Sequence, residues 1–197
     1  MFQFIESIKV EDQKAFLLDL HQQRVRETFA HFGKECSIDL EKIFKDLEHD
    51  EDGLYKLRIV YDLEGNFKSQ MLPYAFPEIE TFELVENNDF SYDFKFADRT
   101  EFEKMKKKAR AQEIIIVKNG QITDTSFSNL LFLKNQTWYT PKSFLLNGVQ
   151  RQNLLKQGKI KETEITLQNL NEFSHFQLIN SMNEFNQDFV YSIEELK

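Results

Sequence analysis

Hydrophobic and polar residues follow two different spacings along the chain, which predicts a fold of mixed helices and strands. Apolar residues alternate with polar ones in several short runs, as they do in strands with one buried face. Over residues 12–32 they recur instead at helical spacing, and Gly33 stands where such a helix would end. We expect strands over 1–9, 54–61, 67–71 and 81–85, and helices over 12–32, 38–47 and 100–111.

The second half of the chain is organised around one hairpin. The apolar run Glu113–Lys118 is followed by Asn119–Gly120, two residues that tolerate positive φ and favour a tight turn between antiparallel strands. After the turn, residues 121–129 are crowded with polar side chains and lead into the apolar run Leu130–Leu133. These polar groups either bond their own backbone in a polar turn or bind a polar ligand.

An aromatic stretch precedes this hairpin. Aromatic residues alternate over 89–99, which predicts a strand or extended segment with an aromatic face. Lys95 would then lie among aromatic rings, where desolvation lowers the pKa of an amine and makes it a better nucleophile at neutral pH. Because most lysines are solvated, an ordinary surface lysine is the simpler alternative. The alternating residues are Phe90, Tyr92, Phe94 and Phe96.

The remaining segments complete the second half. Trp138–Tyr139 is expected to be a strand, and Thr166 to cap a short helix. Gly148 opens a further predicted helix that Gly158 ends. The N-terminus of that helix is a candidate anion site, because its first N–H groups have no partner within the helix. The alternative is merely a loop before a helix.

Composition excludes several classes of protein. The chain has 197 residues, of which 41% are hydrophobic, enough for a core in one domain or in two small lobes. Its 25 basic and 33 acidic residues give a net charge of −8 without a basic block, which argues against nucleic-acid binding. A single cysteine excludes an internal disulfide, and the sequence shows no signal peptide, membrane-length apolar run or metal-ligand spacing. We therefore expect a soluble cytoplasmic protein without a metal site.

The sequence Ile-Thr-Asp-Thr-Ser-Phe-Ser-Asn-Leu-Leu-Phe at 122–132 closely resembles the signature of class IV aminotransferases, the D-amino-acid and branched-chain aminotransferase-like enzymes. That family also includes 4-amino-4-deoxychorismate lyase. The resemblance implies an α/β (α+β) fold of two lobes, with the cofactor pyridoxal 5'-phosphate (PLP) in the cleft between them. We place a smaller N-terminal lobe at 1–85 and a C-terminal PLP-binding lobe at 86–197.

The resemblance also implies roles for individual residues. Lys95, in a Lys-Phe-Ala-Asp-Arg string like that of short family members, would form a Schiff base with PLP and act as the catalytic base. Asp124 would pair with the ring nitrogen of the cofactor. Arg24, in the string His21-Gln-Gln-Arg24, would bind the phosphate, for which its planar guanidinium is suited. The implied cofactor-binding residues are Arg24, Lys95, Asp124, Ser126, Asn129, Val149, Gln150 and Ser181.

The sequence departs from the family pattern at some of these positions. Family members commonly carry glutamate where Asp124 stands and threonine where Gln150 stands. The implied function is an aminotransferase that moves an amino group between an amino acid and a 2-oxo acid. One alternative is the lyase that releases pyruvate from aminodeoxychorismate, and another is a non-catalytic relative that binds PLP. We expect a small-molecule amino substrate and a homodimer, with no nucleic acid and no membrane as partner.

Overall fold

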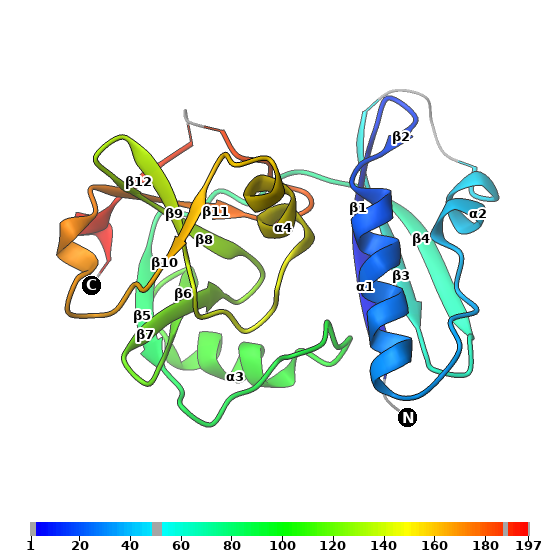
Figure 1. Ribbon diagram of the computed structural model, residues 1–197, viewed down its shortest axis with the longest axis horizontal. Coiled ribbons are helices and arrows are strands. Elements are labelled where there is room, and N and C mark those ends of the chain that lie inside the picture. Colours follow the sequence, from blue (N-terminus) through cyan, green and yellow to red (C-terminus); the bar gives the residue numbers. More distant parts are fainter. Residues whose placement is uncertain (1–2, 49–52, 187–188, 197) are drawn as a thin grey trace. The chain divides into compact units, whose positions relative to one another are not determined.

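The protein divides into two compact units (Figure 1). In this computed structural model, residues 3–48, 53–186 and 189–196 are described, so Met1 and Phe2 of the first expected strand lie outside the described residues. Unit 1 consists of Met1–Phe76 and Phe94–Asp98, and unit 2 of Pro77–Asp93 and Arg99–Lys197. The chain thus returns to unit 1 for the short segment that contains Lys95.

Unit 1 is an antiparallel sheet with the strand order β2-β1-β3-β4 and two helices. Side chains that alternate along β1 and β3 pack with α1 and α2 in one core, centred on Phe4, Ile8, Val25, Phe29 and Leu57. The strands predicted in this part of the chain are confirmed. The long helix predicted over 12–32 is confirmed only over Leu18–His31, because Lys14–Ala15 pairs with β1 as strand β2. The elements are β1 (Phe4–Glu11), β2 (Lys14–Ala15), α1 (Leu18–His31), α2 (Leu40–Lys45), β3 (Leu54–Tyr61) and β4 (Phe67–Pro73).

Unit 2 contains a three-stranded sheet, β5-β6-β7, and a five-stranded sheet, β10-β9-β8-β11-β12. Its main core includes residues of both sheets, among them Ile115 and Phe132, and Leu154 of α4 packs in a second core with Leu131 and Trp138. The elements are β5 (Phe82–Glu86), α3 (Thr100–Lys108), β6 (Glu113–Lys118), β7 (Gln121–Thr125), β8 (Asn129–Lys134), β9 (Thr137–Pro141), α4 (Val149–Lys156), β10 (Lys161–Thr163), η1 (Leu170–Glu172), β11 (His175–Ile179), β12 (Tyr191–Ser192) and η2 (Ile193–Glu195).

The predicted Asn119–Gly120 hairpin is confirmed. Strands β6 and β7 pair antiparallel, and Asn119 and Gly120 have φ values of 51° and 75°. The polar segment is not a loop between two strands, however, because Gln121–Thr125 itself forms β7 and Asn129 begins β8. Strand β8 belongs to the other sheet of unit 2. The buried polar residues therefore lie where the chain passes from one sheet to the next.

The prediction of a single aromatic face over residues 89–99 is wrong. In unit 2, Phe90 and Tyr92 contact Phe102 edge-on, with ring centroids 4.9 and 4.8 Å apart, and in unit 1 Phe94 and Phe96 pack against Phe4. The alternation arises because two halves of the stretch belong to different cores. Only one isolated bridge, between Phe4 and Phe96, gives the described stretch strand-like pairing.

The helix that Thr166 was expected to cap is much shorter than predicted. Among the described residues this region contains only the short 3-10 helix η1, which begins at Leu170. The Thr166 hydroxyl accepts a hydrogen bond from the N–H of Asn169, and the Asn169 side chain accepts one from the N–H of Thr166. These reciprocal bonds have the pattern of a capping box, so Thr166 caps the turn that leads into η1.

Candidate active site

In unit 1, Arg24 lies in a buried cluster with Glu6 and His21. The Glu6 carboxylate, which is fully buried, accepts hydrogen bonds from Nε of Arg24 at 2.9 Å and from Nη2 of the same guanidinium. Burial would raise the pKa of Glu6, but Arg24 and the hydrogen bond with His21 outweigh it and lower the pKa to about 2. The arginine expected to bind phosphate is therefore held by an ionised carboxylate.

His21 completes this cluster as a neutral imidazole. Burial lowers its pKa below the usual range although Glu6 opposes the shift. Its Nδ1 lies 2.5 Å from Oε2 of Glu6, so in the neutral form Nδ1 carries the proton and donates it to the carboxylate. Nε2 is then an acceptor, and it is buried without a hydrogen-bond partner among the described residues. His21 and Arg24, three residues apart on α1, thus both contact the Glu6 carboxylate.

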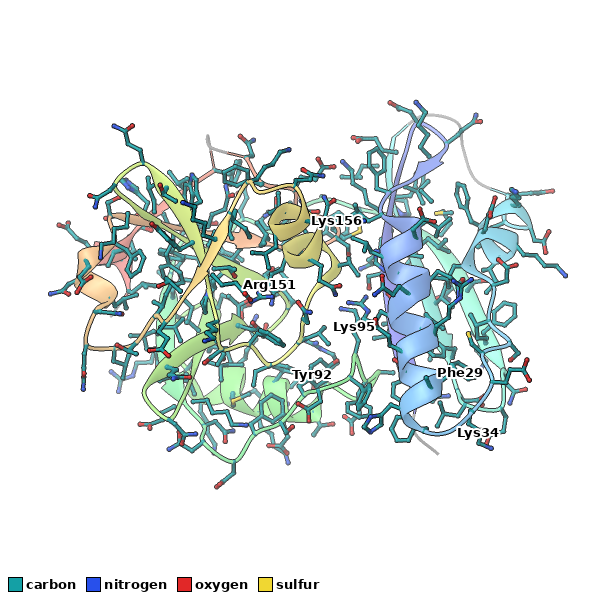
Figure 2. The ribbon with its side chains drawn as sticks, in the orientation of Figure 1. Phe29, Lys34, Tyr92, Lys95, Arg151 and Lys156 are labelled. Carbon is teal, nitrogen blue, oxygen red and sulfur yellow. The ribbon has the colours of Figure 1, made fainter. Side chains whose placement is uncertain are left out.

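Lys95 lies in unit 1, in the segment 94–98 beside β1. The carbonyl oxygen of Lys95 accepts a hydrogen bond from the N–H of Ile5 at 2.9 Å, which fixes the backbone at this point. The side chain is half-buried, and its charge reaches His21, whose pKa it helps to lower. Figure 2 shows Lys95 beside helix α1. Its positive charge acts on His21, which belongs to the same cluster as Arg24.

In unit 2, Asp124 is a buried carboxylate at the centre of the polar segment. Its Oδ1 accepts a hydrogen bond from Nδ2 of Asn129 at 2.9 Å, and its Oδ2 accepts from the N–H groups of Leu145 and Leu146 at 3.1 and 2.8 Å. Burial raises its pKa to about 6, although these hydrogen bonds oppose the shift. Because a carboxylate has about four acceptor positions, three bonds leave room for one further donor.

Asn129 links Asp124 to the start of α4. Its Nδ2 also donates to the carbonyl of Leu146 at 2.9 Å, and its Oδ1 lies so close to Gly148 that a Cβ there would be 2.1 Å from it. Only glycine fits at position 148 without displacing Asn129. The signature residues on β7 and β8 thus set the position of the helix that begins at Val149.

The N-terminus of α4 has the features of an anion site. Val149, Gln150 and Arg151 are all buried, and no side chain caps the helix at Gly148. Buried N–H groups at a helix start need an acceptor, and the positive end of the helix dipole favours an anion. Arg151, labelled in Figure 2, donates to Pro141 O and to Glu162 and so fastens the first turn of α4.

Ser126 and Ser181 lie in turns at the ends of strands of unit 2. The N–H of Ser126 donates to the buried Glu113 carboxylate at 3.0 Å, and its carbonyl accepts a hydrogen bond from Arg99. Ser181 is half-buried after β11, in a turn that the Asn180 side chain braces by accepting from the N–H groups of residues 182 and 183. Asn180 also donates to Ser128 at 2.9 Å and so ties this turn to the polar segment.

Sequence reasoning missed two buried acids, Glu6 and Glu113. A signal for Glu6 was present, because it falls between Phe4 and Ile8 on the buried face of β1, where an acid needs a cation. Glu113 begins the apolar strand β6 and contacts Lys106 at 2.8 Å, but nothing in its spacing shows that it also braces Ser126. For the described residues, no group of three potential metal ligands is found, and no helix is long and apolar enough to cross a membrane.

Comparison with known proteins identifies the family. Residues 3–186 match the amino-transferase class IV family. An uncharacterized protein of Haemophilus influenzae is 30% identical over 187 residues, which covers 93% of this chain and 99% of that protein. A Haemophilus somnus structure described as a candidate 4-amino-4-deoxychorismate lyase is 34% identical, has a TM-score of 0.87, and is matched over 94% of this chain and 98% of that one.

The chain belongs to the class IV aminotransferase family, whose members are enzymes that use PLP. The fold is also that of a hypothetical aminotransferase from Mycobacterium tuberculosis in its PLP-bound form, with a TM-score of 0.75 at 15% identity over 98% of this chain and 81% of that one. The resemblance found in the sequence is therefore confirmed at the level of family and fold.

The residues of this chain fit the cofactor. In unit 2, the uncapped start of α4 offers N–H donors suited to a phosphate. In unit 1, Arg24 offers a cation suited to an anion. A protonated ring nitrogen needs a buried carboxylate with an acceptor position left, which Asp124 has. An aldehyde needs an amine, and Lys95 follows the motif that the family uses for it.

Proposed function

We propose that this protein binds PLP and acts on a small amino substrate. Lys95 would bond the cofactor through Nζ, and Arg24 and the N–H groups of Val149 and Gln150 would be its phosphate ligands. Asp124 would accept a hydrogen bond from the protonated ring nitrogen, with Asn129 orienting the carboxylate. Ser126 and Ser181 complete the polar surroundings. Support for this assignment comes from family membership together with the uncapped start of α4 and the hydrogen bond that orients Asp124.

Each of these residues would have its own role in the reaction. Bound PLP supplies an electron sink for the bond that breaks at the substrate α-carbon. Lys95 would serve as the base and then the acid that moves the proton at that carbon. Asp124 is ionised at neutral pH, since its pKa of about 6 lies below 7, and its burial strengthens its attraction for a protonated nitrogen. Glu6 and His21 hold Arg24 in one orientation throughout.

The single observation that carries the proposal is the buried start of α4 without a side-chain cap. It predicts that Val149→Pro weakens PLP binding, because proline removes one N–H from the candidate phosphate site. Proline is tolerated at the first position of a helix, and Gly148, with φ −65° and ψ 146°, has a conformation compatible with a following proline. Val149→Thr, which keeps the N–H, is the matched control.

Pyridoxal, which lacks the phosphate, distinguishes this role from a general loss of structure. We expect the Kd for PLP to rise about 10-fold in Val149→Pro, as for the loss of one charge-assisted hydrogen bond. The Kd for pyridoxal should stay as in the wild type and in Val149→Thr. Equal losses for both ligands, or no loss for PLP, would refute the phosphate assignment.

Two reactions fit this set of residues, amino transfer and pyruvate release from 4-amino-4-deoxychorismate. The 34% identity to the candidate lyase, over nearly the whole of both chains, favours the second. Pyruvate produced from aminodeoxychorismate without any 2-oxo acid would establish the lyase. Turnover that requires a 2-oxo acid acceptor would establish the aminotransferase.

We also propose that the protein is a homodimer and acts in the cytoplasm. The dimer is what membership of the family suggests. The half-buried Cys36 is a free thiol, which suits a reducing compartment. Light scattering after size-exclusion chromatography tests the dimer, and cell fractionation tests the location.

A further inference from the structure

Four hydroxyl side chains lie in the polar segment between residues 123 and 128, and three of them have partners within unit 2. The Thr123 hydroxyl donates to the Ile116 carbonyl at 2.8 Å. The Thr125 hydroxyl accepts from two N–H groups of its own turn at 3.3 and 2.9 Å, and the Ser128 hydroxyl accepts from Asn180 at 2.9 Å. These three side chains thus satisfy the protein itself, as in a polar turn.

Ser126 is the exception. The residue is 4% exposed, and its hydroxyl has no hydrogen bond with any residue that the structure describes. The oxygen is not one of the fully enclosed polar atoms without a partner, so a ligand can reach it. Because a polar group in a buried position needs a partner, this hydroxyl is the one in the segment that is left for a ligand.

The backbone of Ser126 is bound on both sides by charged side chains. Its N–H donates to Oε1 of Glu113 at 3.0 Å, and its carbonyl accepts from Nη2 of Arg99. The turn does not need these bonds for closure, because the N–H of Thr125 already donates to the Ser128 carbonyl at 2.8 Å. Hydrogen bonds to charged groups are stronger than neutral ones, so Ser126 is held more firmly than the turn requires.

Each of the two charged groups is itself fixed within unit 2. Oε2 of Glu113 lies 2.8 Å from Nζ of Lys106. The Arg99 guanidinium lies over the Phe102 ring, 4.2 Å from its centroid, which leaves the N–H groups in its plane for an acceptor. Arg99 directly precedes α3 and Lys106 lies in the last turn of that helix, so both ends of α3 act on Ser126.

A buried carboxylate in the apolar strand β6 costs free energy that an apolar side chain would not cost, which favours a role in position rather than in stability. We propose that Arg99 and Glu113 are positioning residues, which hold the backbone of Ser126 so that its hydroxyl stays available to a bound ligand. That this ligand is PLP rests on the proposed function.

Hydrogen exchange at the Ser126 amide, followed by NMR on the full chain without added PLP, tests the hold itself. We expect Arg99→Met and Glu113→Gln to speed this exchange roughly 10-fold, as for the loss of a charge-assisted bond. Glu101→Gln is the matched control, because it removes a carboxylate that also pairs with a lysine of α3, Lys104, but on the exposed surface. It should leave the exchange unchanged. Wild-type exchange in both test variants would overturn the proposal.

A double-mutant cycle on PLP binding tests whether the hold acts through the Ser126 hydroxyl. We expect Ser126→Ala to raise the Kd for PLP roughly 3- to 10-fold, as for the loss of one hydrogen bond. Arg99→Met should raise it by a similar factor, but by less than about 2-fold when Ser126 is already replaced by alanine. A side chain that only stabilised the fold would instead weaken binding by the same factor in both backgrounds.

The outcomes of the cycle are decisive in each direction. Equal losses in both backgrounds, no loss in Arg99→Met, or wild-type binding by Ser126→Ala would overturn the proposal. If Arg99→Met does not fold, Glu113→Gln takes its place in the same cycle. A wild type that does not bind PLP would refute the proposed function, whereas the exchange at Ser126 would still show whether Arg99 and Glu113 hold this residue.

Discussion

Glu6 should be one of the main stabilising residues of unit 1, and replacing it tests the buried cluster quantitatively. Its pKa falls from the usual 4.5 to about 2 in the folded protein, a shift that corresponds to about 3 kcal/mol of stability above pH 4.5. Glu6→Gln keeps the size of the side chain but removes the charge that Arg24 and His21 contact. We therefore expect a loss of about 3 kcal/mol at pH 7, a large share of the stability of a small protein.

Urea unfolding followed by circular dichroism gives the free energy, and hydrogen exchange of the α1 amides locates the effect in unit 1. Glu41→Gln is the control, because it removes a carboxylate that pairs with Lys45 at 2.7 Å on the exposed surface, where such pairs contribute little to stability.

The pH dependence has a definite sign. A carboxyl group whose pKa is lowered on folding stabilises the protein above its unfolded pKa and loses this effect as the pH falls toward its folded pKa. The difference in stability between wild type and Glu6→Gln should thus be constant from pH 7 to about 4.5 and shrink from 4.5 toward 2. A difference that is no larger than that of Glu41→Gln, or that does not change with pH in this window, would refute the reasoning.

Further predictions concern unit 2. Gly148→Ala places a Cβ 2.1 Å from Oδ1 of Asn129, and the Asn129 side chain is held by its hydrogen bonds to Asp124 and Leu146. We therefore expect the free energy of unfolding in urea to fall by about 1–3 kcal/mol, and PLP binding to weaken. Asp124 has a raised pKa, so its ionisation lowers the free energy of unfolding as the pH rises from about 4 to 6. Asp124→Asn should remove this decrease. A variant with the same pH dependence of stability as the wild type would contradict the burial of this charge. Arg151→Ala should cost about 2–4 kcal/mol, because it leaves the buried Pro141 carbonyl without its donor; a loss below 0.5 kcal/mol in the same assay would show that α4 does not depend on this side chain.

The local pattern of residues along the chain was sufficient to predict several elements of the fold. The hairpin around Asn119–Gly120 could be predicted because positive φ at two consecutive residues is a property of the turn itself. Strand β3 was predicted with its observed bounds because its alternation reflects one buried and one exposed face. Both features depend on residues close in sequence.

Features that depend on distant residues could not be predicted in this way. The aromatic alternation over 89–99 carried no sign that Tyr92 packs in one unit and Phe94 in the other. Nor does the sequence show that the carboxylate of Glu6, fifteen positions from His21, is the partner of Arg24. The contact between Asn129 and Gly148 likewise arises only when β8 and α4 are packed together.

The central claim is that Lys95 carries PLP, and the absorbance spectrum of the purified protein with added PLP tests it most directly. Lys118→Ala is the matched control, because the Lys118 amine is already engaged with the Phe90 carbonyl at 2.8 Å. We predict a visible band in the wild type and in Lys118→Ala that borohydride removes, and no such band in Lys95→Ala. A wild type without the band, or a band that survives in Lys95→Ala, would contradict the assignment.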